Sequence, residues 1–299
     1  LAEKWDVSED GLTWTFKLRD AKWSDGKPIT ANDFVYAWNR LVDPKTGADY
    51  EYMLDMVKGY DDKKLDISAP DDKTFVVNLG VKCPYFEEIC AFPAVMPVRK
   101  DIVEKNETWT TSPDTLVSSG PYKLEKWEHN QTLTMVKNPE YYDAKSVKAE
   151  KLSFHLQDDQ NAIYAAYRSG DLDFVNSAPQ EEIKKLLDTK ELKTLPYVGT
   201  YFVCFNTEKK PFDDPKVRKA FSLAIDRNFI VDQVTGRGEK AASGFVPAGV
   251  YDADGAKGDD FRTVGGDYYS IKSDEYEKNI KEAKKLMEEA GFKDGKGFP

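Results

Sequence analysis

The run from Trp14 to Trp38, which reads WTFKLRDAKWSDGKPITANDFVYAW, constrains the fold more than any other part of the chain. Residues 13–19 alternate in character, with Trp14, Phe16 and Leu18 on one side and polar residues on the other. A period of two is typical of a β-strand that buries one face. The run therefore predicts a strand at its start and a sheet with a covered side.

The second half of the same run predicts a turn followed by a helix. Asp25-Gly26 is typical of a tight turn in which the glycine takes a positive φ. Thr30 and Asp33 have the spacing of a helix start, where the Thr hydroxyl caps a free backbone N–H. The apolar residues that follow fall on one helical face: Phe34, Ala37, Trp38 and Leu41.

Composition indicates a folded globular protein. The chain has 299 residues, of which 40% are hydrophobic and 32% charged, so it can bury a large core in one or two domains. Its net charge of −10 argues against nucleic acid as a partner, because phosphate recognition needs a basic surface. No apolar stretch approaches the ~20 residues needed to span a bilayer. We find no signal peptide and no lipid-attachment cysteine near residue 1, which leaves a cytosolic protein or a trimmed one.

The order of predicted elements indicates an α/β class with mixed sheets (α+β in parts) rather than a barrel or a bundle. Strands are predicted at 13–19, 74–79, 122–127, 132–137, 151–156 and 201–205. Helices are predicted at 31–41, 160–169, 180–187, 215–225, 228–234 and 273–290. Asp214-Pro215 marks one helix start, and Gly170, Gly236 and Gly291 mark helix ends. The amphipathic helix near the end of the sequence has no following element, so we expect a longer parent protein.

The three cysteines do not suggest a disulfide framework. Cys83 and Cys90 are seven residues apart, which on one helix separates their Cα atoms by ~10 Å, too far for a bridge. A looped geometry that allows the bridge stays open as the less favoured alternative. We interpret Cys83, Cys90 and Cys204 as small buried apolar groups.

Residues 248–267 are rich in glycine and aspartate, which predicts a solvated surface loop. A calcium loop is the alternative, but no glutamate stands at the closing position of an EF-hand.

Catalytic and metal-binding motifs are not found. His129 and His155 lie in strand-like regions without a metal-ligand partner at useful spacing, so we assign them structural roles. The chain has no G-x-S-x-G elbow, no G-x-G-x-x-G fingerprint and no P-loop. Acidic residues are too abundant to single out a carboxylate pair, so a carboxylate-based hydrolase stays only as a weak alternative. We predict no catalytic residue, no metal and no cofactor.

Several segments together resemble the bacterial extracellular solute-binding proteins of family 5, which serve oligopeptide ABC importers. Besides the opening run, the similar segments are Ser119-Gly120-Pro121-Tyr122, Asn138–Tyr142, Tyr167–Asp173, Phe205-Asn206-Thr207, Pro211–Asp214 and Ala224–Arg227. Each is weak alone, but all of them occur in the family's order. Most are expected to have structural roles.

The resemblance implies the larger, two-lobed type of periplasmic-binding-protein fold with an inserted domain, here incomplete. It assigns residues 1–97 to part of the inserted small domain, 98–198 to the middle part of the core domain of the first lobe, and 199–299 to a truncated second lobe. A strand near 197–206 is expected to cross between the lobes beside the ligand cleft.

The resemblance also implies six ligand-binding residues. Tyr50 matches a ligand-contacting tyrosine of the inserted domain, and Tyr197 a cleft tyrosine on the crossing segment. Asn176 and Ser177 lie where the family has an asparagine pair. Phe202 and Cys204 replace a tyrosine and an acidic residue of the family pattern, so we expect altered side-chain pockets.

As a function, the resemblance implies binding of extracellular oligopeptides and their delivery to the permease subunits of an ABC importer. The protein is expected to be a monomer, periplasmic or a cell-surface lipoprotein, held at the membrane only through a lipid anchor absent from this chain. The alternative is the same fold with a dipeptide, a metal chelate or a sugar as ligand.

Overall fold

The computed structural model describes residues 1–195, 197–251 and 258–299. The chain divides into two compact units, Leu1–Asp158 and Asp159–Pro299, and each is described by itself. No helix among the described residues is both long enough and apolar enough to cross a membrane.

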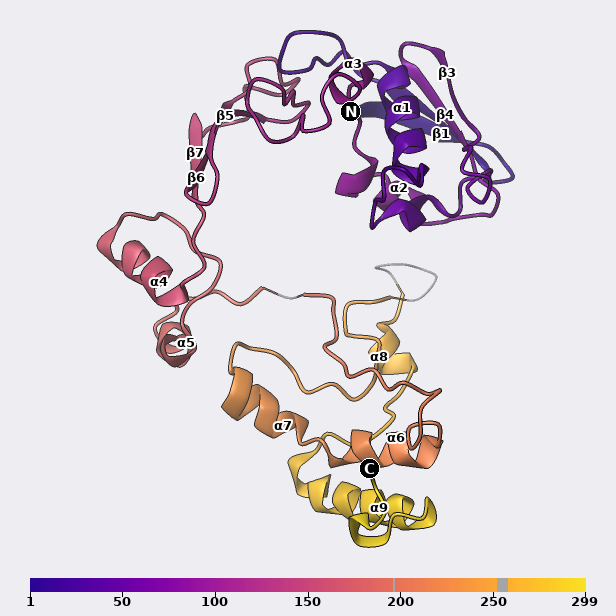
Figure 1. The fold of residues 1–299 in the computed structure, drawn as a ribbon, viewed down its shortest axis with the longest axis vertical. Helices are drawn as coiled ribbons and strands as arrows, with labels where there is room; N and C mark the ends of the chain where they lie inside the picture. The colour runs from indigo at the N-terminus through magenta and orange to yellow at the C-terminus, as the bar shows by residue number, and fades with distance from the viewer. Residues whose placement is uncertain (196, 252–257) are drawn as a thin grey trace. The chain divides into compact units, whose positions relative to one another are not determined.

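The first unit is built on an antiparallel sheet (Figure 1). The sheet has four strands in the order β1-β2-β4-β3. The strands are β1 (Ala2–Val7), β2 (Thr13–Leu18), β3 (Ile67–Asp71) and β4 (Thr74–Asn78). The predicted strands at 13–19 and 74–79 are confirmed, and the alternation is as expected, since Trp14, Phe16 and Leu18 are buried. The strands β1 and β3 were not predicted, because their exposed edges lack a clear apolar alternation.

The helix α1 (Ala31–Val42) packs against β3 and β4, and β4 in turn pairs with β2, the strand of the opening run. At its start the carboxylate of Asp33 accepts a hydrogen bond from the backbone N–H of Thr30, at 2.9 Å. Gly26 has a φ of +85°, as the turn requires. The predicted strand, turn and helix are therefore all present.

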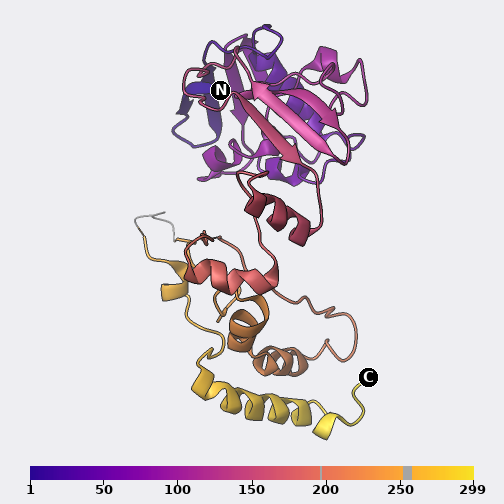
Figure 2. The same ribbon diagram turned by 90° about the vertical axis from the view of Figure 1, so that its left-hand side faces the viewer.

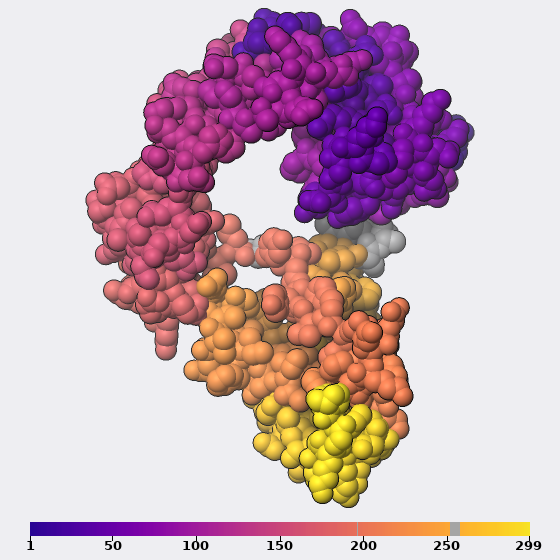
Figure 3. Space-filling model, in the orientation of Figure 1, coloured from indigo at the N-terminus to yellow at the C-terminus, as the bar shows by residue number. Residues whose placement is uncertain are grey.

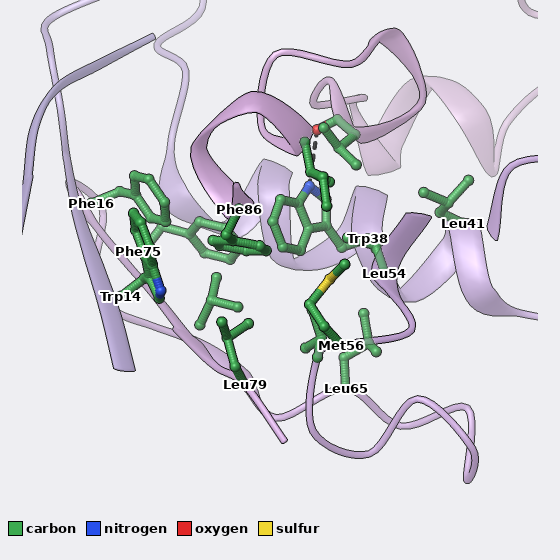
Figure 4. Close-up of a cluster of buried hydrophobic side chains, with 14 of the residues drawn as sticks. Trp14, Phe16, Trp38, Leu41, Leu54, Met56, Leu65, Phe75, Leu79 and Phe86 are labelled. Atoms are coloured by element: carbon green, nitrogen blue, oxygen red, sulfur yellow. Dashed lines mark hydrogen bonds between the residues drawn. The ribbon is translucent and has the colours of Figure 1, made fainter. Parts of the chain in front are cut away.

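Aromatic rings fill the space between this sheet and its covering helices (Figure 4). The Trp38 ring meets Phe75 edge-on, with centroids 5.0 Å apart, and the Trp14 ring meets Phe86 at 5.2 Å. The indole N–H of Trp38 donates to the carbonyl oxygen of Val95 at 2.9 Å, which satisfies the one polar atom of that buried ring. The short helices α2 (Phe86–Ile89), η2 (Pro93–Val95) and α3 (Lys100–Val103) complete this part.

A second antiparallel sheet of order β5-β6-β7 also belongs to the first unit (Figure 2). It consists of β5 (Tyr122–Glu128), β6 (Thr132–Lys137) and β7 (Lys151–His155), as predicted. The turn after β6 is held by Asn138, which is fully buried. Its side-chain amide donates to the Gly120 carbonyl at 2.9 Å and accepts from the Glu140 N–H at 3.1 Å. These contacts give the Asn138–Tyr142 motif a structural role.

The described residues of the second unit form helices and one isolated β-bridge, Tyr251–Asp260. The helices are α4 (Gln160–Ser169), α5 (Gln180–Asp188), α6 (Pro215–Ala224), α7 (Arg227–Phe229), the π-helix η3 (Ile230–Thr235), α8 (Phe261–Val264), α9 (Tyr276–Glu289) and the 3₁₀-helices η5 (Ser273–Glu275) and η6 (Lys293–Gly295). The aspartate before Pro215 caps α6 through its side chain, and the glycines after α4 and η3 are left-handed, all as predicted.

The helices α6 and α9 pack together through Ala220, Leu223, Ala283 and Leu286 (Figure 3, orange and yellow). A smaller cluster joins α4 to α5 through Tyr164, Ile183 and Leu186. The apolar stripe predicted for the last long helix is thus the face that α6 covers.

Two predictions for the second unit are wrong. Residues 201–205 do not form a strand. Among the described residues they have no neighbouring strand, and a strand without a partner leaves its backbone groups unpaired. Cys204 is not buried but exposed, because it lies on this same segment.

The thiols of Cys83, Cys90 and Cys204 are all free, so the less favoured Cys83–Cys90 bridge is absent. Cys83 is buried, as predicted, and Cys90 is half-buried. Burial raises the pKa of the Cys90 thiol to about 12. The loop predicted at 248–267 lies partly outside the described residues, which omit 252–257. Its described part includes the helix α8.

Candidate ligand-binding surfaces

The first candidate surface lies in the first unit, around Tyr50. Tyr50 precedes the 3₁₀-helix η1 (Glu51–Leu54), and its side chain is 48% exposed. Its ring contacts Phe92, with centroids 5.1 Å apart, and Tyr52, at 6.0 Å. Tyr52 is 52% exposed. We call these three rings, Tyr50, Tyr52 and Phe92, the aromatic shelf.

The backbone behind the shelf is firmly held. Leu54 is fully buried in the aromatic core, and the Met56 carbonyl accepts from the Gly80 N–H at 2.8 Å. The Lys58 N–H donates to the Asn78 carbonyl at 2.9 Å, which extends the sheet toward the shelf. These contacts hold the backbone that follows Tyr50 and Tyr52.

An ion pair also supports the shelf. The ammonium group of Lys63 lies 3.1 Å from a carboxylate oxygen of Glu51 and 4.1 Å from the centre of the Tyr60 ring. Desolvation by itself lowers the pKa of Lys63, but the hydrogen bond and charge of Glu51 outweigh it, so the pKa is raised. Lys63 therefore stays charged, and Glu51 is a supporting residue rather than a free carboxylate.

The second candidate surface is an extended segment of the second unit, residues 197–206. Tyr197 is 90% exposed, and Tyr201 is fully exposed. Phe202 is 53% exposed and meets Phe245 edge-on, with ring centroids 4.9 Å apart. In the part of the chain that the structure describes, residues 200–205 make no hydrogen bond. The segment thus presents both its rings and its backbone N–H and C=O groups.

The structure places three of the six predicted site residues, Tyr197, Phe202 and Cys204, on this one segment. Asn176 is exposed in a bend before α5, and Ser177 next to it is half-buried. Tyr50 belongs to the other unit. The ligand-binding roles of all six stay predictions.

Sequence reasoning missed Tyr52, Phe92 and Phe245 as neighbours of the predicted residues. The spacing of two between Tyr50 and Tyr52 was a usable signal, because both rings share one short segment. Phe92 and Phe245 had no such signal, since each is brought to its partner only by folding.

The two histidines lie in the three-stranded sheet and its β5–β6 turn. The His129 ring stacks on Trp127 at 4.2 Å, and His155 pairs with Thr132 at the end of β7. Within residues 1–195, 197–251 and 258–299, no group of three or more His, Cys, Asp or Glu side chains could hold a metal ion.

Comparison with known proteins identifies the family. The model of the bacterial extracellular solute-binding proteins, family 5 (middle), matches residues 1–298. The chain belongs to this family. It is 38% identical over 297 residues to the dipeptide-binding protein DppE of Bacillus subtilis, covering 96% of this chain and 53% of DppE. It is also 38% identical over 306 residues to the periplasmic oligopeptide-binding protein OppA of Salmonella typhimurium, covering 98% of this chain and 54% of OppA.

The fold is that of family 5 proteins of known structure. The crystal structure of Haemophilus influenzae OppA in complex with RPPGFSPFR matches with a TM-score of 0.81 and 33% sequence identity, covering 97% of this chain and 57% of that one. The mixed α/β, periplasmic-binding-protein-like class is therefore confirmed. The chain spans about half the length of the relatives that it matches.

Proposed function

We propose that the full-length family 5 protein containing this chain binds peptides outside the cytoplasm and delivers them to an ABC importer. The observation that carries this proposal is the likeness, over 97% of the chain, to an OppA structure in complex with a peptide. The names of the relatives DppE and OppA support the same ligand class.

The physical basis is strand-like pairing with an extended ligand. Among the described residues, 200–205 make no hydrogen bond, and in this proposal an extended peptide pairs with their backbone N–H and C=O groups, whatever its side chains. Water-filled spaces around the ligand side chains would tolerate different residues. Closure of two lobes about a hinge would then enclose the peptide. No bond of the ligand is broken, so we propose a binding protein and not an enzyme, without cofactor or metal.

The proposal assigns the same roles and boundaries as the resemblance. Residues 1–97 belong to the inserted domain, 98–198 to the core domain of the first lobe and 199–299 to the second lobe. Tyr50, Asn176, Ser177, Tyr197, Phe202 and Cys204 contact the ligand. The protein acts as a monomer in the periplasm or, with a lipid anchor, at the cell surface, and its partners are the permease subunits.

A dipeptide instead of a longer peptide is the second candidate ligand. DppE is named for dipeptides, and its identity to this chain equals that of OppA. Oligopeptides remain our first choice, since the solved relative in the peptide complex holds a ligand of nine residues, RPPGFSPFR.

The test is to purify the full-length protein, release its ligands under denaturing conditions and identify them by mass spectrometry. Calorimetry on the refolded protein then compares peptides of two to nine residues with a sugar and a metal chelate. We expect intact peptides to be released and rebound, with Phe202→Ala weakening binding about tenfold. The matched control is Tyr268→Ala, since Tyr268 is 78% exposed and lies outside the predicted site. Binding of only sugar or chelate, or cleavage of the peptides, would refute the proposal.

A further inference from the structure

Two rings of the aromatic shelf, Tyr50 and Tyr52, are about half exposed although the three rings of the shelf are in contact through Tyr50. In the buried core of this unit, by contrast, Trp38, Phe75 and Phe86 are 0–2% exposed. Tyr50 and Tyr52 keep about half of their surface open while contacting each other and Phe92. Such an arrangement leaves ring faces available to a further group.

The shelf is also fixed before any ligand arrives. Its segment is anchored by the buried Leu54 and by the ion pair between Glu51 and Lys63. A segment whose backbone is already held loses less conformational entropy when a ligand binds to it, and this smaller cost favours binding.

Charge indicates which group would bind there. In the segment 49–55 the exposed residues are Asp49, Tyr50, Tyr52 and Asp55, so a carboxylate stands on either side of the two tyrosines in the sequence. Glu51, the third carboxylate of the segment, is already paired with Lys63. The 299-residue chain carries a net charge of −10. A positively charged group is therefore attracted to this surface, and an anionic one, such as an acidic lipid headgroup, is repelled.

We propose that the aromatic shelf binds an arginine side chain of the peptide ligand. This inference rests on the proposed function and adds a side-chain preference to it. The planar guanidinium stacks on a tyrosine face, which carries the negative part of the ring quadrupole. Its N–H groups remain free to reach Asp49 or Asp55, since carboxylates are good acceptors for the arginine fork. A phenylalanine side chain would use the rings but not the carboxylates.

The experiment uses the full-length protein and a mixture of peptides of two to nine residues, synthesised in pairs that differ only by arginine or citrulline at one position. Citrulline has nearly the shape of arginine but no charge. A third member of each set has phenylalanine at that position. Peptides captured by the protein are counted by mass spectrometry. We expect arginine peptides to be enriched over their citrulline partners on the order of three- to thirtyfold.

Variants locate the effect. Tyr52→Leu should reduce the arginine-to-citrulline ratio toward one, whereas Tyr52→Phe, which keeps the ring, should retain it. Phe154→Leu is the matched control, because Phe154 is also 48% exposed but lies on β7 of the separate three-stranded sheet. The ratio should be unchanged in this variant.

The outcomes are distinct. Capture of no peptide at all refutes the proposed function, and this inference with it. Capture of peptides with a wild-type ratio near one, or with phenylalanine preferred to arginine, refutes the shelf alone and needs no variant to fold. An arginine-to-citrulline ratio that is unchanged in Tyr52→Leu refutes the shelf as the arginine site. If the wild-type protein is a dimer and Tyr52→Leu is a monomer, the shelf is instead an interface between two copies.

Discussion

Arg99 is the buried cation of the first unit, and its removal should destabilise that unit more than the loss of a surface ion pair. The side chain is 6% exposed. Its Nη1 donates to both carboxylate oxygens of Asp25, at 3.0 and 3.2 Å, and its Nε donates to Asp101 at 2.6 Å. Arg99 thus ties the turn of the opening run to the start of α3. The perturbation is Arg99→Met, which keeps much of the apolar stem but removes the charge.

The size of the effect follows from the exposure of the three groups. Breaking a fully buried ion pair costs about 3–5 kcal/mol, whereas an exposed pair contributes roughly 0–1 kcal/mol. Asp25 and Asp101 are 32% and 53% exposed, so water can partly replace the guanidinium around them. Lys27 also remains 3.1 Å from Asp101. We therefore expect the free energy of unfolding to fall by about 2–3 kcal/mol, between the two limits.

Tryptophan fluorescence isolates the relevant unit. All six tryptophans lie between residues 5 and 127, inside the first unit. Urea unfolding followed by this signal therefore reports on the first unit, even if the second unfolds separately. With a denaturant slope on the order of 2 kcal/mol per molar, the midpoint should shift by about 1–1.5 M.

The control is Lys58→Met, which breaks the pair between Lys58 and Asp66, 66% and 43% exposed. Its effect should stay below about 1 kcal/mol. Arg99→Met with an effect no larger than this control would refute the reasoning from burial.

Acid gives an independent check. The hydrogen bond from Arg99 holds the pKa of Asp101 far below its usual value. A carboxyl with a depressed folded-state pKa adds stability above its unfolded pKa of about 3.9, and this stability is lost as the pH falls toward the folded value. The difference between wild type and Arg99→Met should therefore be constant near neutral pH and shrink below about pH 4. A difference that grows on acidification would contradict this assignment.

Two further predictions use matched positions. Gly59 has a φ of +84°, and a Cβ there would lie 2.0 Å from the carbonyl oxygen of Lys64, so Gly59→Ala should cost at least about 3 kcal/mol. Gly47 also has a positive φ but no atom near its Cβ, so Gly47→Ala should cost only about 1–2 kcal/mol in the same urea assay, and equal effects would argue against the clash. Iodoacetamide at pH 8 should label the exposed Cys204 in the folded protein and leave Cys90 unmodified until unfolding, because burial raises the pKa of Cys90 to about 12. Peptide mapping by mass spectrometry measures both sites, and rapid native labelling of Cys90 would refute its protection.

The elements that sequence predicted well are those whose signal is local. In the opening run, alternation, an Asp-Gly turn and a helix-start signature follow one another within 25 residues, and each depends only on near neighbours. The same holds for α6, where Asp214 and Pro215 mark the first turn. The glycine after α4 ends that helix in the left-handed conformation for an equally local reason.

The predictions that failed depend on distant partners. Residues 201–205 have the alternation of a strand, but a strand forms only when a neighbouring strand supplies hydrogen bonds. No strand among the described residues pairs with this segment. Cys204 was expected to be buried because cysteine is usually a buried residue type. It is exposed, because it lies on this same segment. Conversely, β1 and β3 form because β2 and β4 are present beside them, although their own sequences are weakly patterned.

For the candidate surfaces the same division holds. The sequence was sufficient to assign the family, since ordered motifs are a property of the chain itself, whereas the ligand-binding role of Tyr50 stays a prediction. Only tertiary structure brought Phe92 to Tyr50 across some forty intervening residues, buried Arg99 between two carboxylates and left the rings of the shelf half open. Burial and ring contacts depend on which other residues pack against a side chain. Those residues are determined by the fold of the whole unit and not by the neighbours of the side chain in the sequence.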